Sequence, residues 1–217
     1  IGAATAQYAF PGDASYLPSS GSASFLIRIP VNVTASSGSI TYGANIPSIT
    51  ATITPSVPLG SFTVAPVCGV YATTDTTYST ALTGVQNAGT YVTHCTGGTS
   101  PTYWGVPVDG TLTINKAATT ATVLCDPTTV VYTGLAQTPC TASVVGPNLN
   151  LTGLTPTYTN NVNVGTATAS YTYPGDTNHL ASAPASATFT ITRAALTITA
   201  SSATVTYGTT VPAVTYT

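Results

Sequence analysis

Short stretches of alternating apolar and polar residues recur along the chain, and no stretch shows the three-to-four-residue period of an amphipathic helix. In residues 4–10 (ATAQYAF) the alternation places Tyr8 and Phe10 on one face, as the two-residue period of a strand requires. Gly, Pro, Ser and Asn separate these stretches, so strands recur at the short spacing typical of a β-sandwich or barrel. The pattern therefore predicts an all-β fold.

Strand candidates fall into two sets. The first set, 31–35, 39–43, 48–55, 61–67, 71–85, 89–95 and 110–116, fits an immunoglobulin-like sandwich. The second set is 120–124, 128–134, 140–146, 154–160, 165–173 and 186–192. A further strand over 22–29 closes the segment that precedes both. Asp109-Gly110 is expected to form a hairpin turn, because Asp-Gly is favoured there for conformational reasons.

The last quarter of the chain copies the first. Residues 164–180 (VGTATASYTYPGDTNHL) match 1–17 (IGAATAQYAFPGDASYL), and 199–212 (TASSATVTYGTTVP) match 34–47 (TASSGSITYGANIP). Roughly half of the positions are identical if two single-residue slips are allowed. Tyr42 and Tyr207 lie about 165 residues apart, and self-similarity at a fixed period is the sign of a repeat array.

The period contains two kinds of domain and divides the chain into four segments. We expect 1–29 to be the C-terminal part of a second-type domain, 30–116 a first-type domain, 117–193 a second-type domain, and 194–217 the N-terminal part of the next first-type domain. No Gly/Ser linker separates them, so stiffly joined serial domains are expected rather than loosely tethered ones.

Two groups of motifs resemble bacterial immunoglobulin-like repeats. Residues 102–117 (TYWGVPVDGTLTINKA) resemble the closing signature of the MBG type, and TYGANIP and TYGTTVP resemble its opening. VVYTGLAQTP and GTATASYTYPGDTNHLAS resemble a companion type that carries a Gly-Asp turn. The resemblance covers nearly the whole chain. It implies tandem immunoglobulin-like β-sandwich domains in a linear array, as found in long secreted or cell-surface bacterial proteins, many of them adhesin-like.

Charged residues make up only 4% of the 217 residues, and the formal net charge is -2. The chain therefore lacks the basic footprint of a nucleic-acid-binding protein, and weak repulsion should make lateral association between copies easy. The longest apolar runs are interrupted well short of the roughly 20 residues of a membrane span. The expected partners are other copies of the chain, without nucleic acid and without a membrane span in this segment.

The four cysteines, Cys68, Cys95, Cys125 and Cys140, form no CxxC pair, and with two histidines a zinc site is not expected. Disulfides in an oxidising compartment are the better interpretation, which indicates an extracellular or cell-surface location. The local pairs Cys68–Cys95 and Cys125–Cys140 keep each bridge inside one domain. A bridge from Cys95 to Cys125 across the domain boundary is the alternative.

The acidic residues offer no pair for acid–base catalysis. Asp13 and Asp176 are copies of one turn, a full period apart, and we expect each to cap its own turn rather than to form a weak calcium site. His179 occupies the position of Tyr16 in the other copy, which indicates packing rather than a general base. No catalytic residue, metal or cofactor is expected, and the chain is not expected to be an enzyme.

Surface chemistry offers two further candidates. Asn32 and Asn150 begin N-x-Thr sequons and are candidate glycosylation sites, although such triplets arise often by chance in a Thr-rich chain. Trp104 with the tyrosines is able to form a sugar-stacking platform. Tyrosines recur at strand positions in both domain types, however, which favours core packing.

These observations favour a structural segment of a repetitive extracellular bacterial fibre or surface stalk. The alternatives are an adhesin or carbohydrate-binding stalk and an accessory region of an enzyme. The segments 1–29 and 194–217 lack strands of their domains, and each leaves a sandwich edge unpaired. Neighbouring copies would complete them by strand addition, or the segment is a window on a longer repetitive chain.

Overall fold

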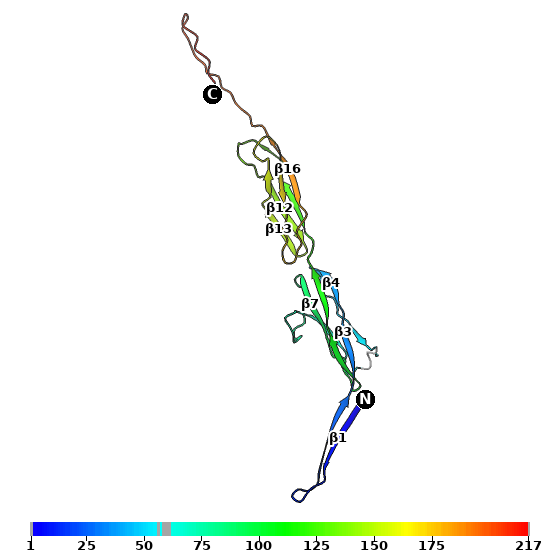
Figure 1. Ribbon diagram of the computed structural model, residues 1–217. Coiled ribbons are helices and arrows are strands. Elements are labelled where there is room, and N and C mark those ends of the chain that lie inside the picture. The colour runs from blue at the N-terminus through cyan, green and yellow to red at the C-terminus, as the bar shows by residue number, and fades with distance from the viewer. Residues whose placement is uncertain (1, 56, 58–61, 217) are drawn as a thin grey trace. The chain divides into compact units, whose positions relative to one another are not determined.

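The computed structural model describes residues 2–55, 57 and 62–216 (Figure 1). Within these residues the chain is all-β, with sixteen strands in five sheets and no helix. Residue contacts group the chain into two compact units. The first unit contains residues 1–119, 146–148 and 174–181, and the second contains 120–145, 149–173 and 182–217.

The first unit begins with a two-stranded antiparallel ribbon, drawn in blue in Figure 1. It is formed by β1 (Gly2–Phe10) and β2 (Ser19–Ile27), which pair from Gly2 with Ile27 to Phe10 with Ser19. Phe25 is 53% exposed and Ile27 is 48% exposed. The ribbon therefore encloses no core of its own.

Two sheets of the first unit face each other across a core, which is consistent with a β-sandwich. One sheet has the order β5 (Ala51–Thr54), β3 (Ile29–Ala35), β8 (Tyr103–Val108), and the other β4 (Gly38–Thr41), β9 (Gly110–Asn115), β7 (Gly89–Thr96), β6 (Val67–Tyr71). Val33 and Ala35 pack with Cys95 in one cluster, and Val70 packs with Leu112 and Ile114 in another. Ile49 packs against both clusters and joins them.

Asp109-Gly110 does not form the expected hairpin turn, because β8 and β9 belong to different sheets. The chain crosses from one sheet to the other at these residues. Gly110 passes so close to neighbouring groups that a Cβ there would lie 2.6 Å from the carbonyl oxygen of Ala35 and 2.6 Å from Oγ1 of Thr93. A residue without a side chain is therefore required at the crossing.

The expected strand over 71–85 is wrong beyond its first residue. Residues 72–88 form a loop, in which the Asp75 carboxylate accepts hydrogen bonds from the amides of Thr77, Ser79 and Thr80. Tyr78 has a φ of 52°. Such local side-chain-to-backbone bonds compete with a sheet ladder, and the alternating pattern alone does not reveal them.

The second unit also has two sheets around one core. Their orders are β10 (Thr120–Cys125), β12 (Cys140–Gly146), β13 (Leu149–Leu154) and β11 (Thr129–Val131), β16 (Ala185–Thr192), β15 (Gly165–Tyr171), β14 (Thr157–Thr159). β12, β13 and β16 are labelled in Figure 1. Val123 and Ala142 from the first sheet pack with Ala167, Phe189 and Ile191 from the second. The strand β13 was not expected from the sequence pattern.

Both disulfides form the local pairs. Cys68 bonds to Cys95 and Cys125 to Cys140, and each pair joins directly opposed residues of neighbouring antiparallel strands. The sequence separations are 27 and 15 residues. Each bridge therefore links strands of one sheet and closes a loop within its own unit.

The two copies of the sequence repeat share their local hydrogen bonds. Ser36 N–H donates to the Thr50 carbonyl at 2.8 Å, and Ser201 N–H donates to the Thr215 carbonyl at 2.8 Å. The register of β1 with β2 likewise corresponds to that of β15 with β16. Burial differs, because Phe189 is 2% exposed whereas its counterpart Phe25 is 53% exposed.

Candidate functional site: the Asp176 turn

The Asp176 turn, residues 174–181, connects β15 to β16 and belongs to the first unit. Oδ1 of Asp176 accepts hydrogen bonds from the amides of Asn178 and His179, both at 2.7 Å. Gly175 has a φ of +83°, and a Cβ there would lie 2.9 Å from the Ala181 nitrogen. Asp and Gly therefore set the shape of the turn.

The other copy of the turn has the same internal bonds. Oδ1 of Asp13 accepts hydrogen bonds from the amides of Ser15 and Tyr16, at 2.7 and 2.8 Å. Gly12 has a φ of +86°. Asp13 and Asp176 each lie in their own turn and accept hydrogen bonds from its amides, as the repeat predicts.

His179 joins the Asp176 turn to other parts of the first unit. Its Nδ1 lies 2.9 Å from both carboxylate oxygens of Asp176, and its Nε2 lies 2.8 Å from the carbonyl oxygen of Pro147. Its ring meets the Tyr42 ring edge-on, with centroids 5.2 Å apart. The residue is 3% exposed. Because a carbonyl and a carboxylate only accept, both ring nitrogens donate, and the arrangement fits the protonated imidazolium.

The surroundings of His179 favour its charged form. The hydrogen bond to the Pro147 carbonyl raises the pKa of His179 above its ordinary 6.5, burial opposes this, and the hydrogen bond and charge of Asp176 raise the pKa further. Sequence comparison of the copies identified the position as one for packing. It did not show the ion pair with Asp176, because Tyr16 cannot form one.

Backbone bonds add to these contacts. Ala117, which is 1% exposed, donates its N–H to the Asn178 carbonyl at 2.9 Å and accepts from the Leu180 N–H at 2.8 Å. Nζ of Lys116 donates to the carbonyl oxygen of Asp176 at 2.6 Å. The residues that follow β9 are therefore paired with the turn.

Asn178 connects the turn to the loop before β7. Its Oδ1 accepts the N–H of Ala88 at 2.8 Å, and its Nδ2 donates to Oδ1 of Asn87 at 3.0 Å. Both functional groups of the amide are used. Ser15, its counterpart in the other copy, is too short to make both bonds.

A glycine corner completes the site. Gly43 has a φ of +98°, and a Cβ there would lie 2.7 Å from Cβ of Pro147. In the counterpart corner a Cβ at Gly208 would meet nothing within 4 Å, and Tyr207 is fully exposed. The Asp176 turn thus combines the ion pair of His179 with Asp176, the hydrogen bonds of the Asn178 side-chain amide and the backbone hydrogen bonds of Ala117. Such contacts are suited to holding segments of the first unit together.

A second polar cluster lies elsewhere in the first unit. Nδ1 of His94 lies 2.5 Å from Oδ1 of Asp109, and the Tyr78 hydroxyl donates to Oδ2 of Asp109 at 2.6 Å. The Tyr78 ring stacks on the His94 ring with centroids 3.6 Å apart. The sequence analysis does not predict this cluster, because it expects Asp109 in a hairpin turn and because Tyr78 lies 31 residues before Asp109 in the chain.

The pKa values in this cluster follow its hydrogen bonds. Burial raises the pKa of Asp109, but hydrogen bonds from Tyr78 and His94 outweigh it and leave the pKa below the ordinary 3.8. The hydrogen bond to Asp109 raises the pKa of Tyr78. The charged Asp109 carboxylate therefore binds both Tyr78 of the 72–88 loop and His94 of β7, at the residues where the chain passes from one sheet to the other.

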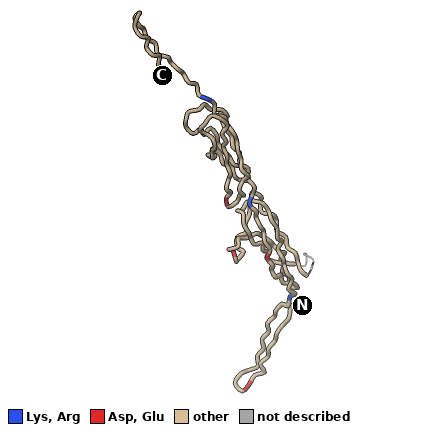
Figure 2. Tube along the Cα trace, turned by 45° about the horizontal axis from the view of Figure 1, so that its top comes forward, with Lys and Arg blue, Asp and Glu red and all other residues tan. Residues whose placement is uncertain are grey.

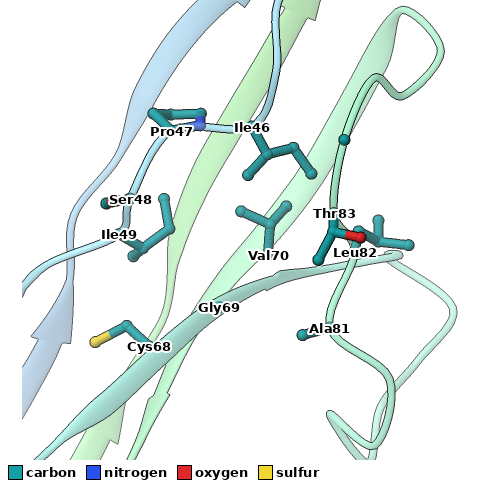
Figure 3. A pocket seen from close by; sticks show the side chains of 11 residues that line it. Ile46, Pro47, Ser48, Ile49, Cys68, Gly69, Val70, Ala81, Leu82 and Thr83 are labelled. Carbon is teal, nitrogen blue, oxygen red and sulfur yellow. The ribbon is translucent and has the colours of Figure 1, made fainter.

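A groove of about 280 Å³ opens beside the disulfide of the first unit (Figure 3). Ile46 and Ile49 line one side, Val70 of β6 lines the floor, and Leu82 lines the other side, as Figure 3 shows. The Leu82 N–H donates to the Val70 carbonyl at 2.8 Å. Its lining is a mixture of polar and apolar surface, and the lining residues include no charged side chain.

Trp104 does not pack in the core, contrary to prediction. It is 54% exposed, and the Arg28 guanidinium lies 5.9 Å from the centre of its ring. The inward position of β8 is occupied by the buried Gly105, where a Cβ would lie 2.4 Å from the Gly97 carbonyl oxygen. Trp104 is therefore turned outward, and it lines a surface hollow with Leu26, Arg28 and Pro30.

The candidate glycosylation sites remain predictions. Asn32 in β3 and Asn150 in β13 both have exposed side chains, which a glycan acceptor requires. Among the described residues no three His, Cys, Asp or Glu side chains lie close enough together to bind a metal ion. No helix in the described ranges has the length and apolar character to cross a membrane. Figure 2 shows the charged residues as isolated positions along the trace.

Comparison of the chain with family models and with curated proteins finds no match.

Proposed function

We propose that the chain is a structural segment of a repetitive extracellular bacterial fibre or surface stalk, made of tandem immunoglobulin-like domains. The observation that carries the proposal is the repetition of local structure. The Asp13 and Asp176 turns, and the Ser36–Thr50 and Ser201–Thr215 links, have the same hydrogen bonds in both copies. A module that recurs with its turns intact is typical of repeat arrays.

A stiff join between successive domain types is part of the proposal. It rests on the sequence, in which no Gly/Ser-rich linker separates the two kinds of domain.

The disulfides indicate the compartment in which the chain works, and the low charge of the chain indicates its partners. Two disulfides within single sheets indicate a non-reducing environment. A charged fraction of 4% allows close lateral approach of copies. Other copies of the chain are therefore the proposed partners, and the exposed Phe25 and Ile27 of the ribbon are where a neighbouring copy or a flanking repeat would complete the sandwich.

Imaging of the native material at low electron dose tests this function. We expect filaments whose axial repeat equals one two-domain period. Particles without an axial repeat, together with a monodisperse monomer at high protein concentration, would refute the proposal. Analytical ultracentrifugation of the chain over a concentration series gives the second measurement.

A carbohydrate-binding stalk is the alternative function, and the exposed Trp104 favours it. Trp104 with the nearby Arg28 offers an aromatic face and hydrogen-bond donors beside it, as sugar-binding surfaces do. A glycan array distinguishes the two functions. Binding that is lost on Trp104→Ala supports the carbohydrate-binding stalk, and no binding by the intact chain removes it.

A further inference from the structure

The surface hollow at Trp104 has the size of a ligand site. Its volume is about 390 Å³, and it is lined by Leu26, Arg28, Pro30 and Trp104. Small-molecule sites commonly measure roughly 300–1,000 Å³. Leu26 is 49% exposed and Trp104 is 54% exposed. The hollow is therefore open to solvent, and it combines apolar surface with a single positive charge.

The backbone on both sides of the hollow is fixed by strand pairing. Ile29, the residue after Arg28, donates its N–H to the Thr102 carbonyl at 2.8 Å. Pro30 lies opposite Trp104 in the parallel pair of β3 with β8. A binding site is more precisely shaped when its residues are carried by strands than when they are carried by loops. Arg28 and Trp104 are thus held beside each other before any ligand arrives.

Arg28 has no anionic partner among the described residues. Both ion pairs that these residues form have histidine as the cation, so neither includes Arg28. Its side chain is half-buried, and its Nε is buried and makes no hydrogen bond with the described residues. Burial removes water from the guanidinium, and an anion with hydrogen-bond acceptors would compensate for that loss. The hollow therefore favours a ligand that carries a negative charge.

An arginine recurs at the same position of the sequence repeat. Arg193 lies 165 residues after Arg28 (193 − 28), the offset that also separates Tyr207 from Tyr42. The chain contains only three lysines and arginines in all. Two of these three basic residues thus occupy one repeat position, which favours a role for the positive charge at that position.

Polar side chains continue the site along the outer face of the sheet. Asn32 lies two residues after Pro30 in β3, on the same face of the strand. It lies opposite Thr54 of β5, and both residues are exposed. Their amide and hydroxyl groups are hydrogen-bond donors and acceptors close to the aromatic ring. A ligand with hydroxyl groups as well as a negative charge fits this face.

We propose that the hollow at Arg28 and Trp104 binds a uronic acid residue of an acidic polysaccharide. The planar guanidinium matches a carboxylate, to which it donates parallel hydrogen bonds. The C–H face of the sugar ring packs against the exposed part of Trp104, and the sugar hydroxyls bond to Asn32 and Thr54.

This ligand goes beyond the structural role of a fibre or stalk, and it names the class of glycan for the carbohydrate-binding alternative. It rests on the proposed repeat array in one respect only. An array carries this arginine once in every period, so a polysaccharide with a carboxylate on each sugar is able to bind several periods at once. Binding of a short oligosaccharide to one hollow does not depend on the array.

Fluorescence of the intact chain tests the proposal directly, because Trp104 is its only tryptophan. The probes are a short oligogalacturonate and its methyl ester, which keeps the sugar rings and loses the charge. We expect a saturable change in Trp104 emission with the free acid, weakened by added salt, and none with the ester at the same concentrations. Equal responses to both probes, or no saturable response to the acid, would overturn the proposal.

Variants assign the binding to the hollow, with calorimetry as the readout and thermal melting as the check of folding. Arg28→Gln should weaken binding of the oligogalacturonate about tenfold or more, since it removes a charged hydrogen-bond donor. Arg28→Lys keeps the charge without the planar fork and should lie between the two. The matched control is Arg193→Gln, which removes the same charge from the exposed counterpart. Equal losses in Arg28→Gln and Arg193→Gln would mean attraction by net charge alone and would overturn the site.

The outcomes separate this proposal from the proposed functions. Equal binding of the acid and the ester would leave the carbohydrate-binding alternative in place and overturn the acidic ligand. Binding of the acid with unchanged Trp104 emission would place the ligand elsewhere and overturn the site. Filaments with an axial repeat are expected whichever result is obtained, so the structural function is tested separately.

Discussion

Reduction of the two disulfides should lengthen the segment of chain that each unit releases when force unfolds it. Cys68–Cys95 closes a separation of 27 residues, and Cys125–Cys140 closes one of 15. While the bridges are intact, these residues cannot extend. An extended chain spans at most about 3.3–3.6 Å per residue, so reduction should add roughly 90 Å to the first unit and roughly 50 Å to the second.

The measurement is the contour-length increment of each unfolding event, recorded with and without a reductant at one loading rate. A double variant, Cys68→Ser with Cys95→Ser, provides the matched control. It should lengthen the larger increment without reductant and leave the smaller one unchanged. At equilibrium, chemical denaturation should show each unit losing about 3–4 kcal/mol on reduction, since closure of loops of this size contributes about that much.

Two results would refute this reasoning. Increments that do not change on reduction would mean that the bridges do not close these loops. A single long increment in place of two would mean that Cys95 pairs with Cys125, because that bridge would connect the two units covalently.

Three substitutions follow from the contacts of the first unit. The pKa of His179 in the folded protein is raised above 6.5. The stabilising effect of its protonated ring is therefore complete below about pH 6.5 and is lost as the pH rises through the folded-state pKa. Melting temperatures measured over a pH series should show this loss of stability, and the His179→Tyr variant should not show it. Asp176→Ala should lower the free energy of unfolding of the first unit by about 2 kcal/mol, because the Asp176 carboxylate accepts several hydrogen bonds. The control Asp13→Ala should change that free energy by less than about 0.5 kcal/mol. Equal losses in the two variants would contradict the role of the Asp176 turn. Gly110→Ala should cost about 1–3 kcal/mol in urea denaturation through overpacking, and Gly38→Ala, whose Cβ would meet nothing within 4 Å, is its control.

The sequence predicted those features that depend on neighbouring residues. Alternation identified most strands, and the local cysteine pairs follow from keeping each bridge inside one domain. The repeat identified the Asp13 and Asp176 turns, because Gly, Asp and the two amides that Asp binds lie within a few residues. In each case the cause and the effect are close together in the chain.

Features that depend on tertiary contacts were missed or assigned wrongly. Asp109-Gly110 has the residues of a hairpin turn, but the choice between a hairpin and a change of sheet depends on where β3 and β4 lie. Trp104 was expected in the core, and its outward direction follows from the crowding at Gly105. His94, Tyr78 and Asp109 come together only after the 72–88 loop folds back over β7.

The two copies of the repeat separate what the local sequence determines from what the surroundings determine. The Asp13 turn keeps its capping bonds although Tyr16 is 70% exposed and Leu17 is 87% exposed. The same turn around Asp176 buries His179 to 3% exposure. The turn therefore takes this shape even where its residues are exposed, as around Asp13. The contacts around Asp176 are not needed to form the turn. A preformed turn loses little conformational entropy when it docks, so the contacts of His179, Asn178 and Ala117 are available to hold the turn in place rather than to shape it.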